Sequence, residues 1–283
     1  MRTLGLWVVL GVLATHVTAA ASPRLPELHS RSAVVLDTAT GDEVYSKQAD
    51  DVRSIASTTK IFVALAVRGK HVDLDGWTAI TRGDAYAARG GSRTRLDVGE
   101  AFTNRDLLRA MLIASDNRAP TALARAAGMD PDELVAAMNE VAKQLGLAHT
   151  HFTDPNGLRG NVSTARELAR ALEAALQDDV LREIMGDDHR VVVARGGKSR
   201  IEYTSTNQPL VEKKWDVIGG KTGYTDAAGY CFVTAARIGG REVVMAFLHA
   251  DGKHARFADF DEVADWIDRG GAERLASSSI VAK

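Results

Sequence analysis

Hydrophobic residues form short strand-like runs near both ends of this chain and recur at helical spacing in between. Near the start, the runs 33–37 and 43–47 flank a turn that contains Gly41, a pattern typical of a β-hairpin. After Asp188 the runs are again short and rich in β-branched residues, and they predict strands at 191–193, 217–218, 230–234 and 242–248. Residues 236–241 favour a second hairpin, and the spacing of 257–267 predicts a terminal amphipathic helix.

The middle of the chain carries helix start and stop signals. Thr103 with Asp106, and Thr164 with Glu167, are capping patterns that precede apolar stretches. Together with the Asp130-Pro131 start, they predict helices at about 104–115, from 117 onward, at 131–145 and at 165–175. Residues 78–100 are irregular and glycine-rich, with an exposed loop expected at 89–92. The pattern predicts a single α/β (α+β) domain over 22–283 with a helical insertion at about 78–185.

One stretch, 54–67, places a hydroxyl and an amine at the start of an almost wholly apolar run. If a helix begins near Ser57, then Ser57 and Lys60 share one face, and the run from Ile61 to Val67 must be buried. Burial disfavours the charged form of a lysine, so Lys60 is a candidate neutral base for the Ser57 proton. The alternative is a surface serine and lysine that flank a core helix, because a lone Ser-x-x-Lys spacing often arises by chance.

Composition narrows the class of protein. With 283 residues, 45% of them hydrophobic and 25% charged, the chain is expected to form a large core. Residues 1–21 are typical of a cleaved secretory signal, because Arg2 precedes an apolar run shorter than the ~20 residues of a membrane span. The formal net charge of −2 gives no basis for nucleic-acid binding. The single cysteine, Cys231, excludes an internal disulfide and is expected to be a buried small hydrophobe.

Three polar clusters follow one another along the chain: Ser57 with Lys60, Ser115 with Asn117, and Lys221-Thr222-Gly223. In this order they match the set described for serine enzymes that react with β-lactams and D-Ala-D-Ala peptides. The set suits an acyl transfer in which the serine attacks a carbonyl and the lysine takes its proton. Ser115 could pass that proton to the leaving nitrogen, while Asn117 hydrogen-bonds the substrate or the lysine. Lys221 and Thr222 would hold a substrate carboxylate, and Gly223 would let a peptide backbone lie close.

Other interpretations compete for individual clusters. Ser205-Thr206-Asn207 also fits Ser-x-Asn, but it lies in a turn-like polar stretch close to Lys221 and ranks below Ser115. A phosphate-binding loop ending in Gly220-Lys221-Thr222 would need a glycine where Trp215 stands. The eight histidines show no His-Glu-x-x-His pattern, so a zinc peptidase is not indicated.

From about Ala33 to His249 the chain resembles the low-molecular-mass penicillin-binding proteins, the D-alanyl-D-alanine carboxypeptidase and endopeptidase family (serine peptidase family S11). The resemblance rests on the segments 57–60, 115–119, 154–158, 162–165, 219–225 and 228–229. It implies a serine β-lactamase/transpeptidase-like fold, with an antiparallel sheet flanked by helices and an all-helical subdomain. It also implies an oxyanion hole from the backbone N–H groups of Ser57 and Tyr224, and no metal or cofactor.

The chain looks closest to the penicillin-binding protein 7 type of D,D-endopeptidase. That type implies a periplasmic enzyme that binds β-lactam antibiotics and cuts D-Ala to meso-diaminopimelate crosslinks between peptidoglycan peptide stems. About 34 residues follow His249, enough for one helix but not for the additional β-domain and anchoring helix of membrane-bound carboxypeptidases, so no stable membrane anchor is expected.

Three alternatives remain open. A D-alanyl-D-alanine carboxypeptidase would use the same acyl-transfer groups to trim pentapeptides. A class A β-lactamase would share all three clusters, but the Glu-x-x-Leu-Asn element of those enzymes does not occur between Asn117 and Lys221. A non-catalytic binding protein on the same scaffold is disfavoured because Ser57, Lys60, Ser115 and Lys221 are all intact.

Overall fold

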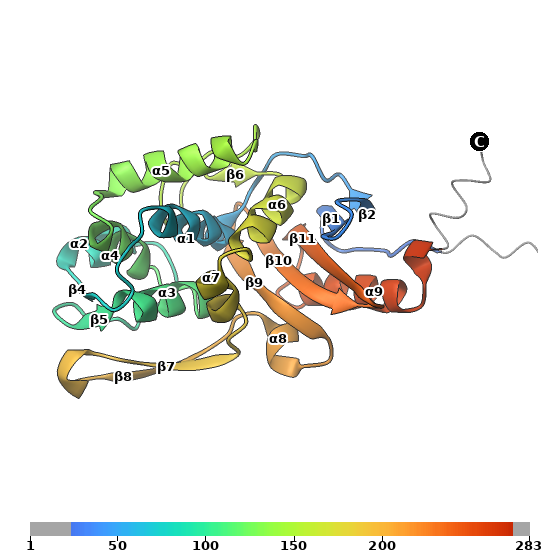
Figure 1. Cartoon of the computed structure of the whole chain (residues 1–283). Coiled ribbons are helices and arrows are strands. Elements are labelled where there is room, and N and C mark those ends of the chain that lie inside the picture. Colours follow the sequence, from blue (N-terminus) through green and yellow to red (C-terminus); the bar gives the residue numbers. More distant parts are fainter. Residues whose placement is uncertain (1–23, 274–283) are drawn as a thin grey trace, which may run out of the picture.

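Five strands form one antiparallel sheet in the spatial order β2-β1-β11-β10-β9 (Figure 1). The computed structural model describes residues 24–273, so the predicted signal at 1–21 lies outside the described residues. Because β1 pairs with β11, the two ends of the described chain meet in the sheet, and both predicted hairpins are confirmed. The strands are β1 (Ser32–Asp37), β2 (Glu43–Lys47), β9 (Asp216–Thr225), β10 (Gly229–Ile238) and β11 (Arg241–Ala250).

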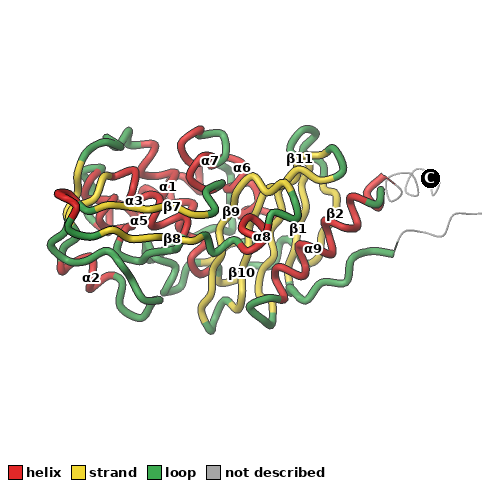
Figure 2. The backbone as a smooth tube through the Cα atoms, turned by 90° about the horizontal axis from the view of Figure 1, so that it is seen from below, coloured by secondary structure: helices red, strands yellow, loops and turns green. Residues whose placement is uncertain are grey.

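Helices cover both faces of the sheet, which is why β1, β10 and β11 are buried on both sides along most of their length. Along β1 the side chains alternate: Val34 and Leu36 belong to the core shared with α6 (Ala165–Ala175), whereas Ala33 and Val35 belong to the core shared with α9 (Ala255–Asp268). Figures 1 and 2 show α9 on one side of the sheet and α6 on the other. The terminal helix predicted from its spacing is therefore confirmed.

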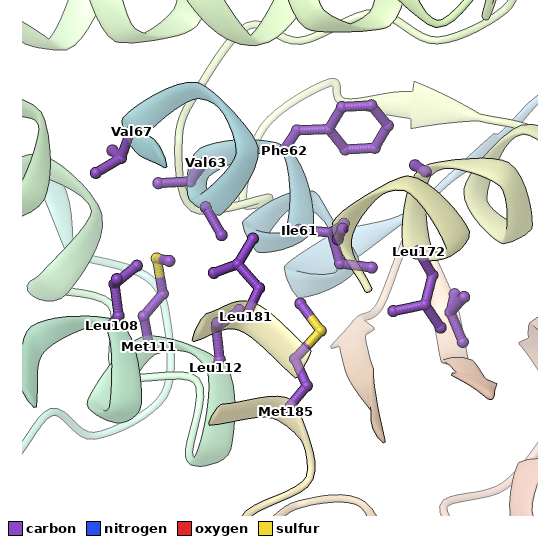
Figure 3. Packing of buried hydrophobic residues seen from close by; sticks show 14 of the residues in the cluster. Ile61, Phe62, Val63, Val67, Leu108, Met111, Leu112, Leu172, Leu181 and Met185 are labelled. Carbon is purple, nitrogen blue, oxygen red and sulfur yellow. The ribbon is translucent and has the colours of Figure 1, made fainter. Parts of the chain in front are cut away.

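The middle of the chain packs as helices around α1 (Lys60–Gly69). Of the run from Ile61 to Val67, all residues except Leu65 are buried, as predicted. Figure 3 shows its side chains meeting those of α3, α6 and α7, with Leu108 and Leu181 among them. The remaining helices of this part are α2 (Arg82–Ala87), α3 (Asn104–Ile113), α4 (Ala119–Ala126), α5 (Pro131–Gln144) and α7 (Asp179–Met185).

The predicted capping side chains accept backbone N–H groups at the first turns of these helices. The Thr103 hydroxyl accepts the Asp106 N–H at 3.1 Å, and the Thr164 hydroxyl accepts the Glu167 N–H at 3.1 Å. Asp130 forms a full capping box at the start of α5. The longest helices have 14 residues, and none in residues 24–273 combines the length and apolar character needed to cross a membrane.

Several elements depart from the sequence prediction. The segment 78–100, predicted to be irregular, contains α2 and the end of β4 (Trp77–Ala79), and β4 pairs with β5 (Ala101–Thr103), which follows the segment. The predicted strand at 191–193 is confirmed as part of β7 (His189–Val193), which pairs with β8 (Arg200–Thr204) in a hairpin separate from the main sheet. Other short elements are β3 (Arg53–Ser54), β6 (Val162–Ser163), α8 (Gln208–Glu212) and the 3₁₀ turns η1 (Ala56–Thr59) and η2 (Arg195–Gly197).

Candidate active site

The helix predicted to begin near Ser57 begins one turn later. The 3₁₀ turn η1 comes first, and the α-helix starts at Lys60. The Thr58 hydroxyl donates to the Ile55 carbonyl at 2.7 Å, and this local hydrogen bond favours a tight turn over the first turn of an α-helix. Residues three apart eclipse one another in a 3₁₀ helix. The turn therefore brings the Lys60 amine beside Ser57, with Nζ 2.8 Å from Ser57 Oγ.

The Lys60 amine is fully buried and has three oxygen neighbours. Besides Ser57 Oγ, it lies 2.7 Å from Asn117 Oδ1 and 3.0 Å from the Asn156 carbonyl oxygen. The last two oxygens can only accept hydrogen bonds, and a neutral amine has two N–H donors and one lone pair. When both donors are used on the carbonyls, the lone pair points to the Ser57 hydroxyl.

Two carboxylates lie near this amine without touching it. Burial lowers the pKa of Lys60 to about 7, while the charges of Asp154 and Asp116 oppose that shift. Asp154 Oδ1 accepts the N–H groups of Asn156 and Gly157 at 2.8 and 2.9 Å. Asp154 therefore organises the loop that directs the Asn156 carbonyl at Lys60.

Asp116 likewise accepts hydrogen bonds from the segments around the second cluster, Ser115 with Asn117. Its carboxylate accepts the backbone N–H of Arg95 at 2.7 Å and the Tyr203 hydroxyl at 3.1 Å. The neighbouring Asn117 is 2% exposed, with its amide oxygen on Lys60. Ser115 adopts a φ of +63°, and its buried Oγ has no hydrogen-bond partner among the described residues. That hydroxyl therefore keeps its full hydrogen-bonding capacity for a substrate.

The third cluster lies on β9, the edge strand of the sheet. A Cβ added to Gly223 would stand only 3.0 Å from the Ser57 backbone nitrogen, so a glycine is required for the strand to approach the 3₁₀ turn. Lys221 is buried, and its amine donates to the Thr222 carbonyl at 2.9 Å. Burial holds the pKa of Lys221 well below its usual range, and the nearby positive charge of Lys60 adds to this.

The competing Ser205-Thr206-Asn207 cluster also reaches this region, but with different contacts. Ser205 and Thr206 line the cleft beside Thr222, whose hydroxyl donates to the Thr206 hydroxyl at 2.7 Å. Asn207 instead caps α8 by accepting the Leu210 N–H. Within the described residues, only one of the two Ser-x-Asn candidates, Ser115-Asp116-Asn117, places its amide oxygen on the Lys60 amine.

All eight predicted site residues come together around one cleft of about 1070 Å³. Lys60 and Lys221 are buried and are not among the residues that line it. The six that line it are Ser57, Ser115, Asn117, Thr222, Gly223 and Tyr224.

Two contributions to the site were not anticipated from the sequence. Arg256 of α9 lines the cleft, and its guanidinium donates to the carbonyls of Gly223 and Cys231 at 2.8 and 3.0 Å. Burial lowers the pKa of Arg256 to about 10. The Asn156 carbonyl is the second contribution, and a backbone carbonyl leaves no mark in the sequence beyond the turn composition of 154–157. Cys231 is buried as predicted, and burial raises the pKa of its thiol to about 11.

Comparisons with known proteins give the family and the fold of the chain. Residues 16–252 match the D-alanyl-D-alanine carboxypeptidase family, peptidase S11. A D-alanyl-D-alanine endopeptidase from Pseudomonas aeruginosa is 35% identical over 98% of this chain and 89% of its own length. A D-alanyl-D-alanine carboxypeptidase from Mycobacterium tuberculosis is 31% identical over 90% of this chain and 87% of its own. The crystal structure of the Streptomyces K15 DD-transpeptidase superposes with a TM-score of 0.78 at 29% identity, covering 85% of this chain and 97% of that one.

Proposed function

The chain belongs to the peptidase S11 family of D-alanyl-D-alanine carboxypeptidases, and within it we propose a periplasmic D,D-endopeptidase that cuts D-Ala to meso-diaminopimelate crosslinks. It is a serine-type D-Ala-D-Ala peptidase, a hydrolase that acts on peptidoglycan and binds penicillin. The observation that carries the proposed mechanism is the buried Lys60 amine, whose Nζ lies 2.8 Å from Ser57 Oγ and also contacts two carbonyl oxygens. The name of the Pseudomonas aeruginosa relative supports the endopeptidase assignment.

In the proposed first step, Ser57 Oγ attacks the D-Ala carbonyl carbon and Lys60 accepts its proton. The bond to the leaving nitrogen then breaks as that nitrogen takes up a proton from the Ser115 hydroxyl, which in turn accepts the proton held by Lys60. An ester joins Ser57 to the D-Ala of the donor stem, and the acceptor stem leaves with a free amine. Water then cleaves the ester and restores the serine.

Two further groups of contacts support a substrate pose in which the D-Ala carbonyl lies at Ser57. The backbone N–H groups of Ser57 and Tyr224 would stabilise the oxyanion, and the close approach of Gly223 to Ser57 brings the two segments together. The carboxylate beside the scissile bond would bind near Thr222 and Arg256, with the Lys221 amine behind them. In a crosslink this carboxylate belongs to diaminopimelate, and in a pentapeptide it belongs to the terminal D-Ala.

The choice between endopeptidase and carboxypeptidase is tested with both substrates. We expect purified enzyme to convert crosslinked muropeptide dimers to monomers and to remove little terminal D-Ala from monomeric pentapeptide, as read by mass spectrometry. A Ser57→Ala variant is the control for contaminating hydrolases. Release of D-Ala from pentapeptide with dimers left intact would reassign the enzyme as a carboxypeptidase and leave the serine mechanism unchanged.

We also expect slow release of the penicilloyl group and negligible antibiotic hydrolysis. Asp226 is the only carboxylate among the described residues that line the cleft, and it lies beyond Tyr224. The carboxylate of Asp154 is occupied by backbone N–H groups, so neither acid is placed to activate water at Ser57. Intact-protein mass spectrometry should show a penicillin adduct that persists for many minutes. Multiple-turnover hydrolysis of nitrocefin would contradict this expectation and favour the β-lactamase alternative.

A further inference from the structure

One end of the cleft carries two opposite charges that the acyl-transfer mechanism does not use. Asp226 and Lys253 both line the cleft, and both side chains are exposed. Asp226 follows β9 and Lys253 follows β11, and these strand ends lie at the same end of the sheet. The register shows this directly, because Tyr230 of β10 pairs with Tyr224 on one side and with Ala250 on the other.

Neither charge is neutralised by another described side chain. Asp226 Oδ1 accepts the Tyr224 hydroxyl at 2.8 Å, a contact that holds the carboxylate in place and raises the pKa of the Tyr224 hydroxyl. Within residues 24–273, Asp226 and Lys253 form no ion pair with each other or with another side chain. The cleft therefore presents one negative and one positive group to a ligand at the same end.

The direction of the substrate along β9 places its acyl-donor stem at this end. The free edge of β9 can pair with an extended peptide whose scissile carbonyl lies at Ser57. The Lys221 amine and the Thr222 hydroxyl, which precede Gly223 on β9, mark the side of the leaving-group carboxylate. The donor stem must then run the other way past Tyr224, at about 3.3 Å per residue, so that the residue before D-Ala comes opposite 225–226.

We propose that Asp226 and Lys253 bind a zwitterionic side chain on the acyl-donor stem, with Asp226 accepting from its ammonium group and Lys253 donating to its carboxylate. This inference rests on the proposed function, which supplies the orientation of the substrate. In a diaminopimelate stem, the residue before D-Ala ends its side chain in one carbon that carries both groups. A side chain with one charge would leave one of the two protein groups without a partner. The pair would therefore select stems with the free zwitterion over amidated or singly charged stems.

The test compares three penicillins whose acyl side chains match that side chain in length. A D-α-aminopimelyl chain carries both charges, a pimelyl chain only the carboxylate, and an aminohexanoyl chain only the amine. For the unaltered enzyme we expect the second-order rate constant of acylation to be about five- to tenfold higher for the zwitterionic compound than for either analogue. Asp226→Asn should abolish the preference over the pimelyl compound, and Lys253→Met the preference over the aminohexanoyl compound.

The preference is a ratio of acylation rate constants measured on one enzyme preparation, so a smaller fraction of folded protein in a variant does not change it. Asp251→Asn is the matched control, because Asp251 is an exposed acid in the loop of Lys253 that does not line the cleft and faces Arg31 instead. It should retain both preferences. Equal rates with all three penicillins, or preferences unchanged in both site variants, would overturn the subsite while the serine chemistry stands. No acylation by any of the three would overturn the serine chemistry and this subsite together.

Discussion

Replacement of Lys60 with Ala should lower the rate constant of acylation by penicillin about a thousandfold, because Ser57 loses its general base. The expectation follows from the 2.8 Å contact between the amine and Ser57 Oγ. With a pKa of about 7, the amine is mostly protonated below that pH and cannot accept a proton. The wild-type rate constant should therefore rise with pH through about 7 and level off above it. Stopped-flow acylation with a fluorescent penicillin measures both effects.

Two further variants separate the chemistry from the packing. Lys60→Met keeps most of the side-chain volume but has no nitrogen, so it should be as slow as Lys60→Ala and lose the inflection near pH 7. Ser57→Ala sets the baseline, since it should form no covalent adduct at all. Acylation of either Lys60 variant within about tenfold of the wild-type rate would refute the role of the amine, and an adduct on Ser57→Ala would refute the nucleophile.

Replacement of Gly157 with Ala should both destabilise the enzyme and slow acylation. Gly157 has a φ of +81°, and a Cβ at this position would stand 2.0 Å from the carbonyl oxygen of Ala56. The left-handed backbone and the clash together should cost about 2 to 4 kcal/mol, or a fall in Tm of about 10 °C. Relief of the clash moves either the 3₁₀ turn or the loop carrying Asn156, and a displacement of about 1 Å can slow the reaction about a hundredfold.

Gly146→Ala is the matched control for backbone strain. Its φ is +69°, but a Cβ there would meet nothing within 4 Å. We expect a loss of about 1 kcal/mol and a wild-type acylation rate. Calorimetry and acylation kinetics on the same samples provide the comparison. A Gly157→Ala enzyme as stable and as fast as Gly146→Ala would show that the contact between the 154–157 loop and the 3₁₀ turn does not position Ser57.

The sequence predicted best those elements whose signals are local. The caps at Thr103, Asp130 and Thr164 were identified because a side chain and the N–H it accepts lie within three residues of each other. The length of strand β9 was underestimated because its glycines have low strand propensity. Only the packed structure shows which neighbouring groups approach these glycines closely. Gly219 faces Met185, and Gly223 faces the turn that carries Ser57.

The sequence by itself determined the fold class, the family and the candidate residues of the proposed acyl-transfer site, because these depend on periodicity and on motifs with fixed spacing. Only the tertiary structure decided how these residues are arranged around one another. The approach of three oxygens to the Lys60 amine, the burial that lowers its pKa, and the arrival of Arg256 from the terminal helix all depend on segments far apart in the chain. Desolvation and hydrogen-bond geometry depend on the surroundings of a group, and those surroundings form only when the helices close over the sheet.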